Sequence, residues 1–127
     1  MLIRIKNLRV RTIVGINVWE RNRKQQVVIN VEMEVDERKA VDTDSLEYSV
    51  DYKKTTKRII QETAESKFHL LESLSHRILS LVMEDARVRK ATVEVDKPRA
   101  LRFAESVSVV CSAERTRKKT KIHQKKP

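Results

Sequence analysis

Lys97 lies at a position where the strand pattern predicts a core residue. Ala91, Val93 and Val95 form the apolar face of that strand, and Lys97 is the next residue in phase with them. Burial disfavours the charged form of an amine, so Lys97 is a candidate for proton transfer. The alternative is a side chain that extends to solvent from a frayed strand end, because Pro98 follows and cannot donate to a sheet ladder.

A second candidate region is the segment 15–24, which contains the only glycine of the chain, Gly15. A lone glycine is typical of a backbone position that other residues cannot adopt. Taken alone, Glu20 in this segment is interpreted as a solvated loop acid, and Trp19 either packs on a ligand or is a partly buried anchor.

The composition predicts one folded domain followed by a basic tail. The chain has 127 residues and a formal net charge of +10, and seven Lys or Arg with no acid lie within residues 115–127. Subtracting these seven from +10 leaves +3 for residues 1–114. We expect residues 1–115 to form the domain and residues 116–127 to be a disordered tail.

Several classes of protein are disfavoured. The single cysteine, Cys111, excludes an internal disulfide, and no Cys/His pair has the spacing of a zinc site, so a cytoplasmic, metal-free protein is expected. No signal peptide or bilayer-spanning apolar run is found, which argues against a membrane partner. A nucleic-acid-binding module that works through the tail is an alternative of another class, but no nucleic-acid motif supports it.

Hydrophobic periodicity predicts six regular elements. Strands are expected over 2–14, 27–35, 89–97 and 105–114, and helices over 51–65 and 70–84. The first strand changes phase near Asn7, which indicates a bulge, and Ser49 or Asp51 caps the first helix. This order favours an α+β domain with an antiparallel four-stranded sheet and both helices on one face. Leu79 and Met83 lie outside the main apolar stripe of the second helix and indicate a second buried contact, for which another subunit is one candidate. The open sheet edges are consistent with assembly.

Five motifs between Leu2 and Arg115 have a specific order and spacing. They read IRIKNL at 3–8, RTIVGI at 11–16, VDY at 50–52, LLE at 70–72 and DKPRALRFAES at 96–106. Together they resemble the dihydroneopterin aldolase family, and more closely its dihydroneopterin triphosphate 2′-epimerase branch. Aldolases typically carry Tyr-His-Gly where this chain has residues 13–15 and a proline-rich stretch where it has residues 99–103.

The resemblance implies a fold and an activity. The fold is the tunnelling fold, in which four subunits join their sheets into a barrel and two rings stack into a homo-octamer, with active sites between subunits. The implied partner is a small 7,8-dihydropterin with a hydroxylated side chain, and the implied reaction is a cofactor-free 2′-epimerisation by retro-aldol cleavage and re-addition. The alternative is an aldolase that releases glycolaldehyde and 6-hydroxymethyl-7,8-dihydropterin.

The resemblance also implies catalytic residues. Lys97 matches the acid–base lysine of the family, Tyr52 matches a tyrosine that shuttles a proton across the subunit interface, and Glu20 matches a loop glutamate near the substrate. From the residues alone, Tyr52 is equally interpreted as a core tyrosine at the start of a helix.

The implied substrate-binding residues lie in three motifs. Glu72 matches the glutamate that accepts two N–H donors from the pterin, and the backbone of Leu71 and Val50 meets the pterin edge. Without the resemblance, Glu72 complements a helix dipole. Arg99 and Arg102 are candidates to receive a triphosphate because guanidinium groups pair well with phosphate oxygens, and the alternative is an exposed basic loop.

Overall fold

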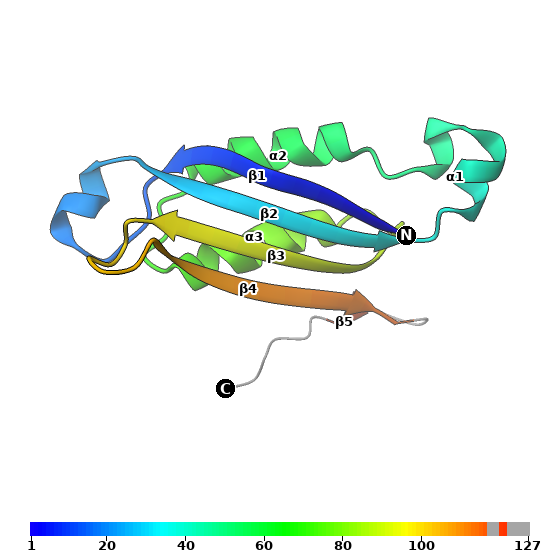
Figure 1. Ribbon diagram of the computed structural model, residues 1–127. Coiled ribbons are helices and arrows are strands. Elements are labelled where there is room, and N and C mark those ends of the chain that lie inside the picture. Colours follow the sequence, from blue (N-terminus) through cyan, green and yellow to red (C-terminus); the bar gives the residue numbers. More distant parts are fainter. Residues whose placement is uncertain (117–119, 122–127) are drawn as a thin grey trace.

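The computed structural model, which describes residues 1–116 and 120–121, contains one antiparallel sheet with two helices on one face (Figure 1). The sheet order follows the chain: β1 (Leu2–Thr12), β2 (Gln25–Val35), β3 (Val88–Pro98), β4 (Ser106–Arg115) and the two-residue β5 (Thr120–Lys121). The predicted α+β class and the four main strands are confirmed. β5 pairs with the end of β4 and was not predicted, and most of the predicted tail lies outside the described residues.

A bulge in β1 keeps its apolar residues on one side of the sheet. The register against β2 shifts between Ile5 and Leu8, Asn7 has a φ of 54°, and its N–H donates to the side chain of Asn30 at 2.9 Å. As a result, Ile5 before the bulge and Leu8 after it both pack against the core. The predicted bulge is therefore confirmed.

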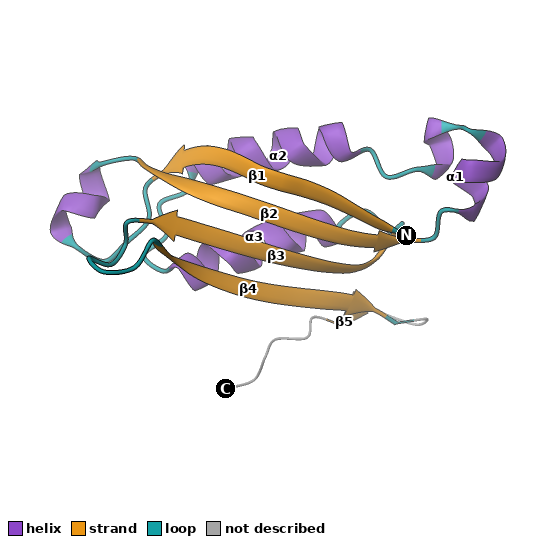
Figure 2. Cartoon of the chain, viewed as in Figure 1, coloured by secondary structure: helices purple, strands orange, loops and turns teal. Residues whose placement is uncertain are grey.

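Two antiparallel helices cover the apolar face of the sheet: α2 (Tyr52–Glu65) and α3 (Leu71–Met83) (Figure 2). Asp51 caps α2, because its carboxylate accepts the N–H of Lys54 at 3.1 Å. Leu79 and Met83 are buried within the chain. The predicted second buried contact of these two residues is confirmed, but its suggested source in another subunit is wrong, because α3 packs on β4 as well as on β3.

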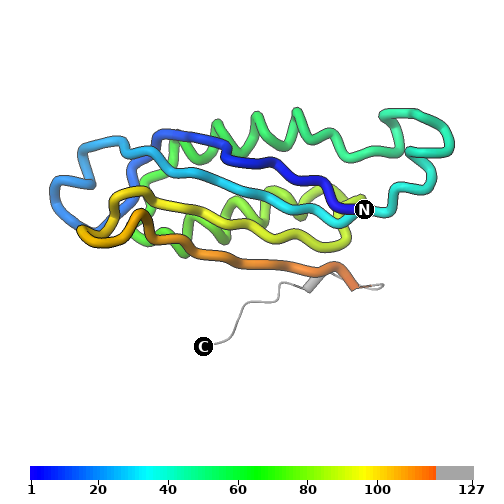
Figure 3. Tube along the Cα trace, in the orientation of Figure 1, coloured from blue at the N-terminus to red at the C-terminus, as the bar shows by residue number. Residues whose placement is uncertain are grey.

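Short helical segments lie at the two opposite ends of the sheet (Figure 3). The 3₁₀ helix η1 (Val18–Asn22) lies at the end of the sheet where β3 ends, whereas α1 (Arg38–Thr43) and the 3₁₀ helix η2 (Leu46–Tyr48) lie at the end that contains the N-terminus. None of these short helices was predicted, because fewer than two turns give no usable periodicity. Within residues 1–116 and 120–121, no helix has the length and apolar character needed to cross a membrane.

Candidate active site

Lys97 and Glu20 form a buried ion pair at the end of the sheet that holds η1. The ammonium of Lys97 donates to Glu20 Oε2 and, at 3.3 Å, to the carbonyl of Val14. The two side chains are only 14% and 4% exposed. The predicted core-side position of Lys97 is confirmed, and the solvent-extended alternative is wrong because β3 continues through Pro98.

The carboxylate of Glu20 is held by four donors. Oε1 accepts the backbone N–H of Asn17 at 3.2 Å and its side-chain amide at 2.9 Å, while Oε2 accepts Gln25 Nε2 at 2.9 Å in addition to Lys97. Burial by itself raises the pKa of Glu20, but the hydrogen bonds from Lys97, Gln25 and Asn17 outweigh it and lower the pKa to about 2. The interpretation of Glu20 as a solvated loop acid is therefore wrong, and its carboxylate is ionised at neutral pH.

Gly15 is required by the position of Glu20. Its φ of 137° is unfavourable for residues with a side chain, and a Cβ built there would overlap the Glu20 carboxylate. The N–H of Gly15 also donates to the carbonyl of Phe68 at 3.2 Å, which ties this loop to the α2–α3 connection. The lone glycine thus makes room for the buried acid.

Arg21 fixes the same loop and was missed by the sequence analysis. Its guanidinium donates to the carbonyls of Gly15 at 2.9 Å, Phe68 at 3.0 Å and Lys67 at 2.6 Å. These bonds join η1 to the segment that leads into α3. In the sequence Arg21 is one of several neighbouring cations, and no local signal distinguishes it from Arg23.

The first turn of α3 and the β3–β4 loop lie at this end as well. Leu71 is buried and Glu72 is exposed. In the loop, Arg99 has a φ of 60° and its N–H donates to the carbonyl of Glu105 at 2.9 Å, which closes the turn. Arg102 is exposed and lies 5.7 Å from the ring centroid of Phe103.

Tyr52 and Val50 lie at the opposite end of the same subunit. Tyr52 is 53% exposed, so its interpretation as a core tyrosine is wrong, whereas Val50 is buried. The two ends are separated by the length of α2, whose 14 residues span roughly 20 Å. The C-terminal end of α2 adjoins the Lys97 end, where the Thr12 hydroxyl lies 3.2 Å from the Ser66 carbonyl. The fold of the chain therefore brings Lys97 together with Glu20, but not with Tyr52.

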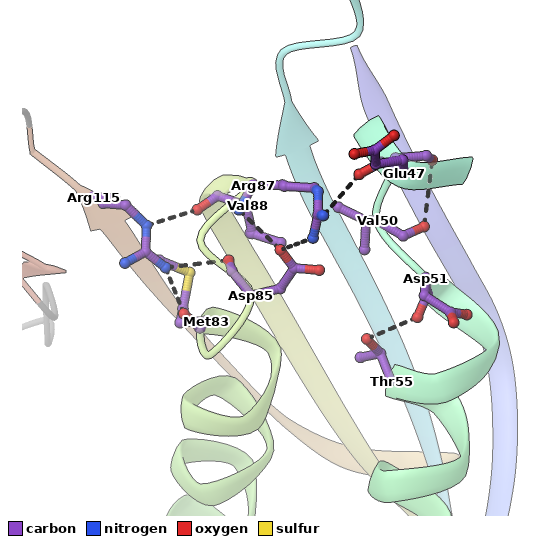
Figure 4. A network of polar contacts seen from close by, with 10 residues as sticks. Glu47, Val50, Asp51, Thr55, Met83, Asp85, Arg87, Val88 and Arg115 are labelled. Atoms are coloured by element: carbon purple, nitrogen blue, oxygen red, sulfur yellow. Dashed lines mark hydrogen bonds and ion pairs between the residues drawn. The ribbon is translucent and has the colours of Figure 1, made fainter. Parts of the chain in front are cut away.

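A network of arginines holds the segment that carries Val50 (Figure 4). Arg87 donates to the Glu47 carbonyl at 2.8 Å and pairs with the Asp85 carboxylate at 3.3 Å. Arg115 donates to the carbonyls of Val88 at 3.1 Å and Asp85 at 3.3 Å, and to that of Met83. The α3–β3 turn is thus joined on one side to β4 and on the other to η2.

Apolar side chains are exposed at both ends of the sheet. Near Lys97 these include Val18, Trp19 and Phe103, which are 84%, 56% and 96% exposed. Trp19 is therefore not the partly buried anchor that was considered. At the other end, Leu46 and Tyr52 are 73% and 53% exposed. Among the described residues, no three His, Cys, Asp or Glu side chains are close enough to hold a metal ion.

Comparison with known proteins identifies the family. A model of the family described as dihydroneopterin aldolase matches residues 3–112. The chain belongs to the dihydroneopterin aldolase family. The dihydroneopterin triphosphate 2′-epimerase of Pseudomonas aeruginosa is 47% identical over 89% of this chain and 92% of its own length. The enzyme of the same name from Escherichia coli strain K12 is 42% identical over 90% of this chain and 95% of its own length. The dihydroneopterin aldolase of Haemophilus influenzae is 27% identical over 84% of this chain and 90% of its own length.

Solved structures of the dihydroneopterin aldolase family have the same fold. A putative dihydroneopterin aldolase from Vibrio cholerae superposes with a TM-score of 0.86 at 27% identity, covering 91% of this chain and 98% of that one. A dihydroneopterin aldolase from Burkholderia thailendensis, whose structure contains bound guanine, superposes with a TM-score of 0.77 at 26% identity, covering 91% and 92%. The subunit therefore has the tunnelling fold that the motifs predicted.

Proposed function

We propose that this protein is a dihydroneopterin triphosphate 2′-epimerase. The observation that carries the proposal is the buried Lys97–Glu20 ion pair, which supplies a candidate proton-transfer group in a chain that is 42–47% identical to two epimerases. The aldolase alternative uses the same residues, but the aldolase relative is only 27% identical. The catalytic domain is proposed to comprise residues 1–115.

Lys97 is the proposed acid–base group, and Glu20 holds it in place. Once its ammonium has released a proton, Lys97 accepts the proton of the substrate 2′-hydroxyl through a water. The C1′–C2′ bond then breaks, its electron pair enters the N5=C6 imine of the pterin, and C2′ becomes the carbonyl carbon of a phosphorylated aldehyde. Re-addition of C1′ to the other face of that aldehyde, with return of the proton to the 2′-oxygen, inverts C2′.

The remaining roles follow from the chemistry of the pterin. The exposed carboxylate of Glu72 suits the paired N–H donors at the 2-amino group and N3, and the backbone of Leu71 lies beside it. Arg99 and Arg102 in the exposed β3–β4 loop are proposed to bind phosphate oxygens. Retention of the phosphorylated aldehyde by this loop favours re-addition over release.

Tyr52 and Val50 are proposed to act in the site of a second subunit. Their separation from Lys97 by the length of α2 supports this arrangement, because no side chain spans roughly 20 Å. The exposed apolar residues at both ends supply surfaces that association would bury. The assembly proposed is a homo-octamer of two stacked four-subunit barrels, in which the sheet edges are paired.

Turnover of purified protein tests the function. Incubation with dihydroneopterin triphosphate is expected to yield the 2′-epimer, and Lys97→Ala is expected to slow turnover by roughly 10²-fold or more. Light scattering should give the mass of eight subunits. Absence of the epimer, or a parent-like rate in the Lys97 variant, would contradict the proposal.

Partitioning between products tests the aldolase alternative. The parent should convert the triphosphate mainly to the epimer, and an Arg99→Ala, Arg102→Ala double variant should release more free aldehyde. If the parent mainly cleaved both dihydroneopterin triphosphate and unphosphorylated dihydroneopterin, that result would favour an aldolase instead.

A further inference from the structure

A hollow of about 960 Å³ lies at the end of the subunit that carries Tyr52. Its apolar lining includes Ile3 from β1 and Val35 from β2, and Tyr52 also lines it. The first two turns of α2 contribute three lysines to the lining: Lys53, Lys54 and Lys57. This hollow is therefore an apolar pocket with a basic rim beside a proposed catalytic residue.

The three lysines are exposed, and no ion pair among residues 1–116 and 120–121 includes them. Of the four acidic residues that line the hollow, all but Asp44 already have a partner within the chain. Asp36 pairs with Arg38 at 2.7 Å, Glu37 lies 3.4 Å from the N-terminal amino group, and Asp51 caps α2. The positive charge of the rim is thus available to a ligand.

The placement of these lysines is unfavourable for the isolated helix. Cations in the first turn oppose the helix dipole, and Lys53 and Lys57, four residues apart, repel each other on one side of α2. A polyanion bound between them would offset both effects. Lys54 projects about 100° further round the helix than Lys53, so the Lys53–Lys57 pair is the better candidate.

We propose that Lys53 and Lys57 of one subunit bind the triphosphate of the substrate in the active site of another. The inference rests on the proposed function, in which Tyr52 of the subunit that supplies the lysines acts in the active site of the other subunit. Lys53 follows Tyr52 directly, and Lys57 lies roughly 6 Å further along the helix axis. The phosphate chain, which extends from C3′ of the substrate, is then held between these lysines and Arg99 and Arg102 of the subunit that supplies Lys97.

Kinetics with two substrates test the binding role. For a Lys53→Ala, Lys57→Ala double variant, the ratio of kcat/KM for dihydroneopterin triphosphate to that for dihydroneopterin should fall roughly 10-fold to 100-fold, mainly through KM. The exposed Lys90 of β3, outside the hollow, provides a control that removes one lysine charge, as each single substitution of the double variant does, and Lys90→Ala should leave the ratio unchanged. An unchanged ratio in the double variant, or an equal loss for both substrates, would overturn the proposal.

Binding of inorganic tripolyphosphate separates this inference from the proposed function. Calorimetry should show salt-sensitive binding to the parent that weakens in the double variant. If the parent protein formed no epimer, the proposed function would be refuted, but the tripolyphosphate titration would still test whether Lys53 and Lys57 bind polyphosphate. Equal binding by parent and double variant would overturn their role.

Mixed oligomers test which subunit supplies the lysines. Subunits with Lys97→Ala are co-expressed with subunits that carry Lys53→Ala and Lys57→Ala. If the lysines act across the interface, some sites combine an intact Lys97 with intact lysines, and kcat/KM for the triphosphate should exceed that of either homo-oligomer. Activity no higher than the average of the two homo-oligomers would overturn the assignment to a second subunit.

Discussion

Replacing Glu20 with Gln tests whether the buried ion pair contributes to stability in the way its surroundings imply. Glutamine keeps the size of the side chain, but its single amide oxygen can replace only one carboxylate oxygen, so it accepts hydrogen bonds from Asn17 or from Gln25 and not from both. The substitution also removes the negative charge beside Lys97. The Lys97 ammonium then stays largely buried without an anionic partner, which is unfavourable. The variant should therefore be less stable than the parent at neutral pH. Its turnover should fall because the ion pair that holds Lys97 in place is lost.

The magnitude follows from the pKa of Glu20. The pKa is lowered from its ordinary value of 4.5 to about 2, so the folded state favours the ionised form by about 3 kcal/mol. Because the folded pKa lies below the unfolded one, this contribution is fully present above pH 4.5 and is lost as the pH falls through 2. The parent and the Gln variant should thus differ most at neutral pH, and their difference should shrink by about 3 kcal/mol on acidification.

Urea unfolding over a pH series at fixed protein concentration measures this difference. Glu32→Gln is the matched control, because Glu32 forms an exposed ion pair with Arg4 at 2.8 Å, and such pairs contribute about 1 kcal/mol or less. A difference between parent and Glu20→Gln that is small, or that does not change between pH 7 and pH 3, would refute the reasoning.

Three further substitutions have distinct expected outcomes. Gly15→Ala should lower the free energy of unfolding by about 1–3 kcal/mol and slow turnover, since the added Cβ strains the backbone and displaces Glu20; parent-like melting and kinetics would contradict this. Glu72→Ala should raise the Kd for a pterin by roughly 10-fold to 100-fold with a smaller effect on kcat, as fluorescence titration would report; an unchanged Kd would remove its proposed role. Arg87→Ala should speed amide hydrogen exchange in residues 46–51, because the bond to the Glu47 carbonyl is lost, and unchanged protection there would show that other contacts hold the segment.

Features set by neighbouring residues were predictable from the sequence. The bulge at Asn7 and the inward position of Lys97 each follow from a local pattern of a few residues, and the same kind of pattern limited the helix cap to Ser49 or Asp51, of which Asp51 is the cap. The motifs added the fold of the subunit, because their order and spacing are specific to one family.

Features set by contacts between distant segments were not predictable. Glu20 is buried only because η1 folds back over the end of the sheet, and its strongest partner is 77 residues away in the chain. Leu79 and Met83 look unpaired on a helical wheel, yet β4 supplies the strand against which this side of α3 packs. A helical wheel records the direction of a side chain but not the elements that surround it.

The close approach of Gly15 to Glu20 makes these two positions epistatic. While residue 20 carries a carboxylate, a side chain at residue 15 overlaps it. A substitution at residue 15 therefore destabilises the folded state in two ways, through the overlap and through the positive φ. Once residue 20 is shortened, only the backbone cost remains, and the two substitutions should be less harmful together than the sum of their separate effects. Mutational paths that abandon the acid should therefore change residue 20 first, and a side chain at residue 15 should disfavour reversion to the acid.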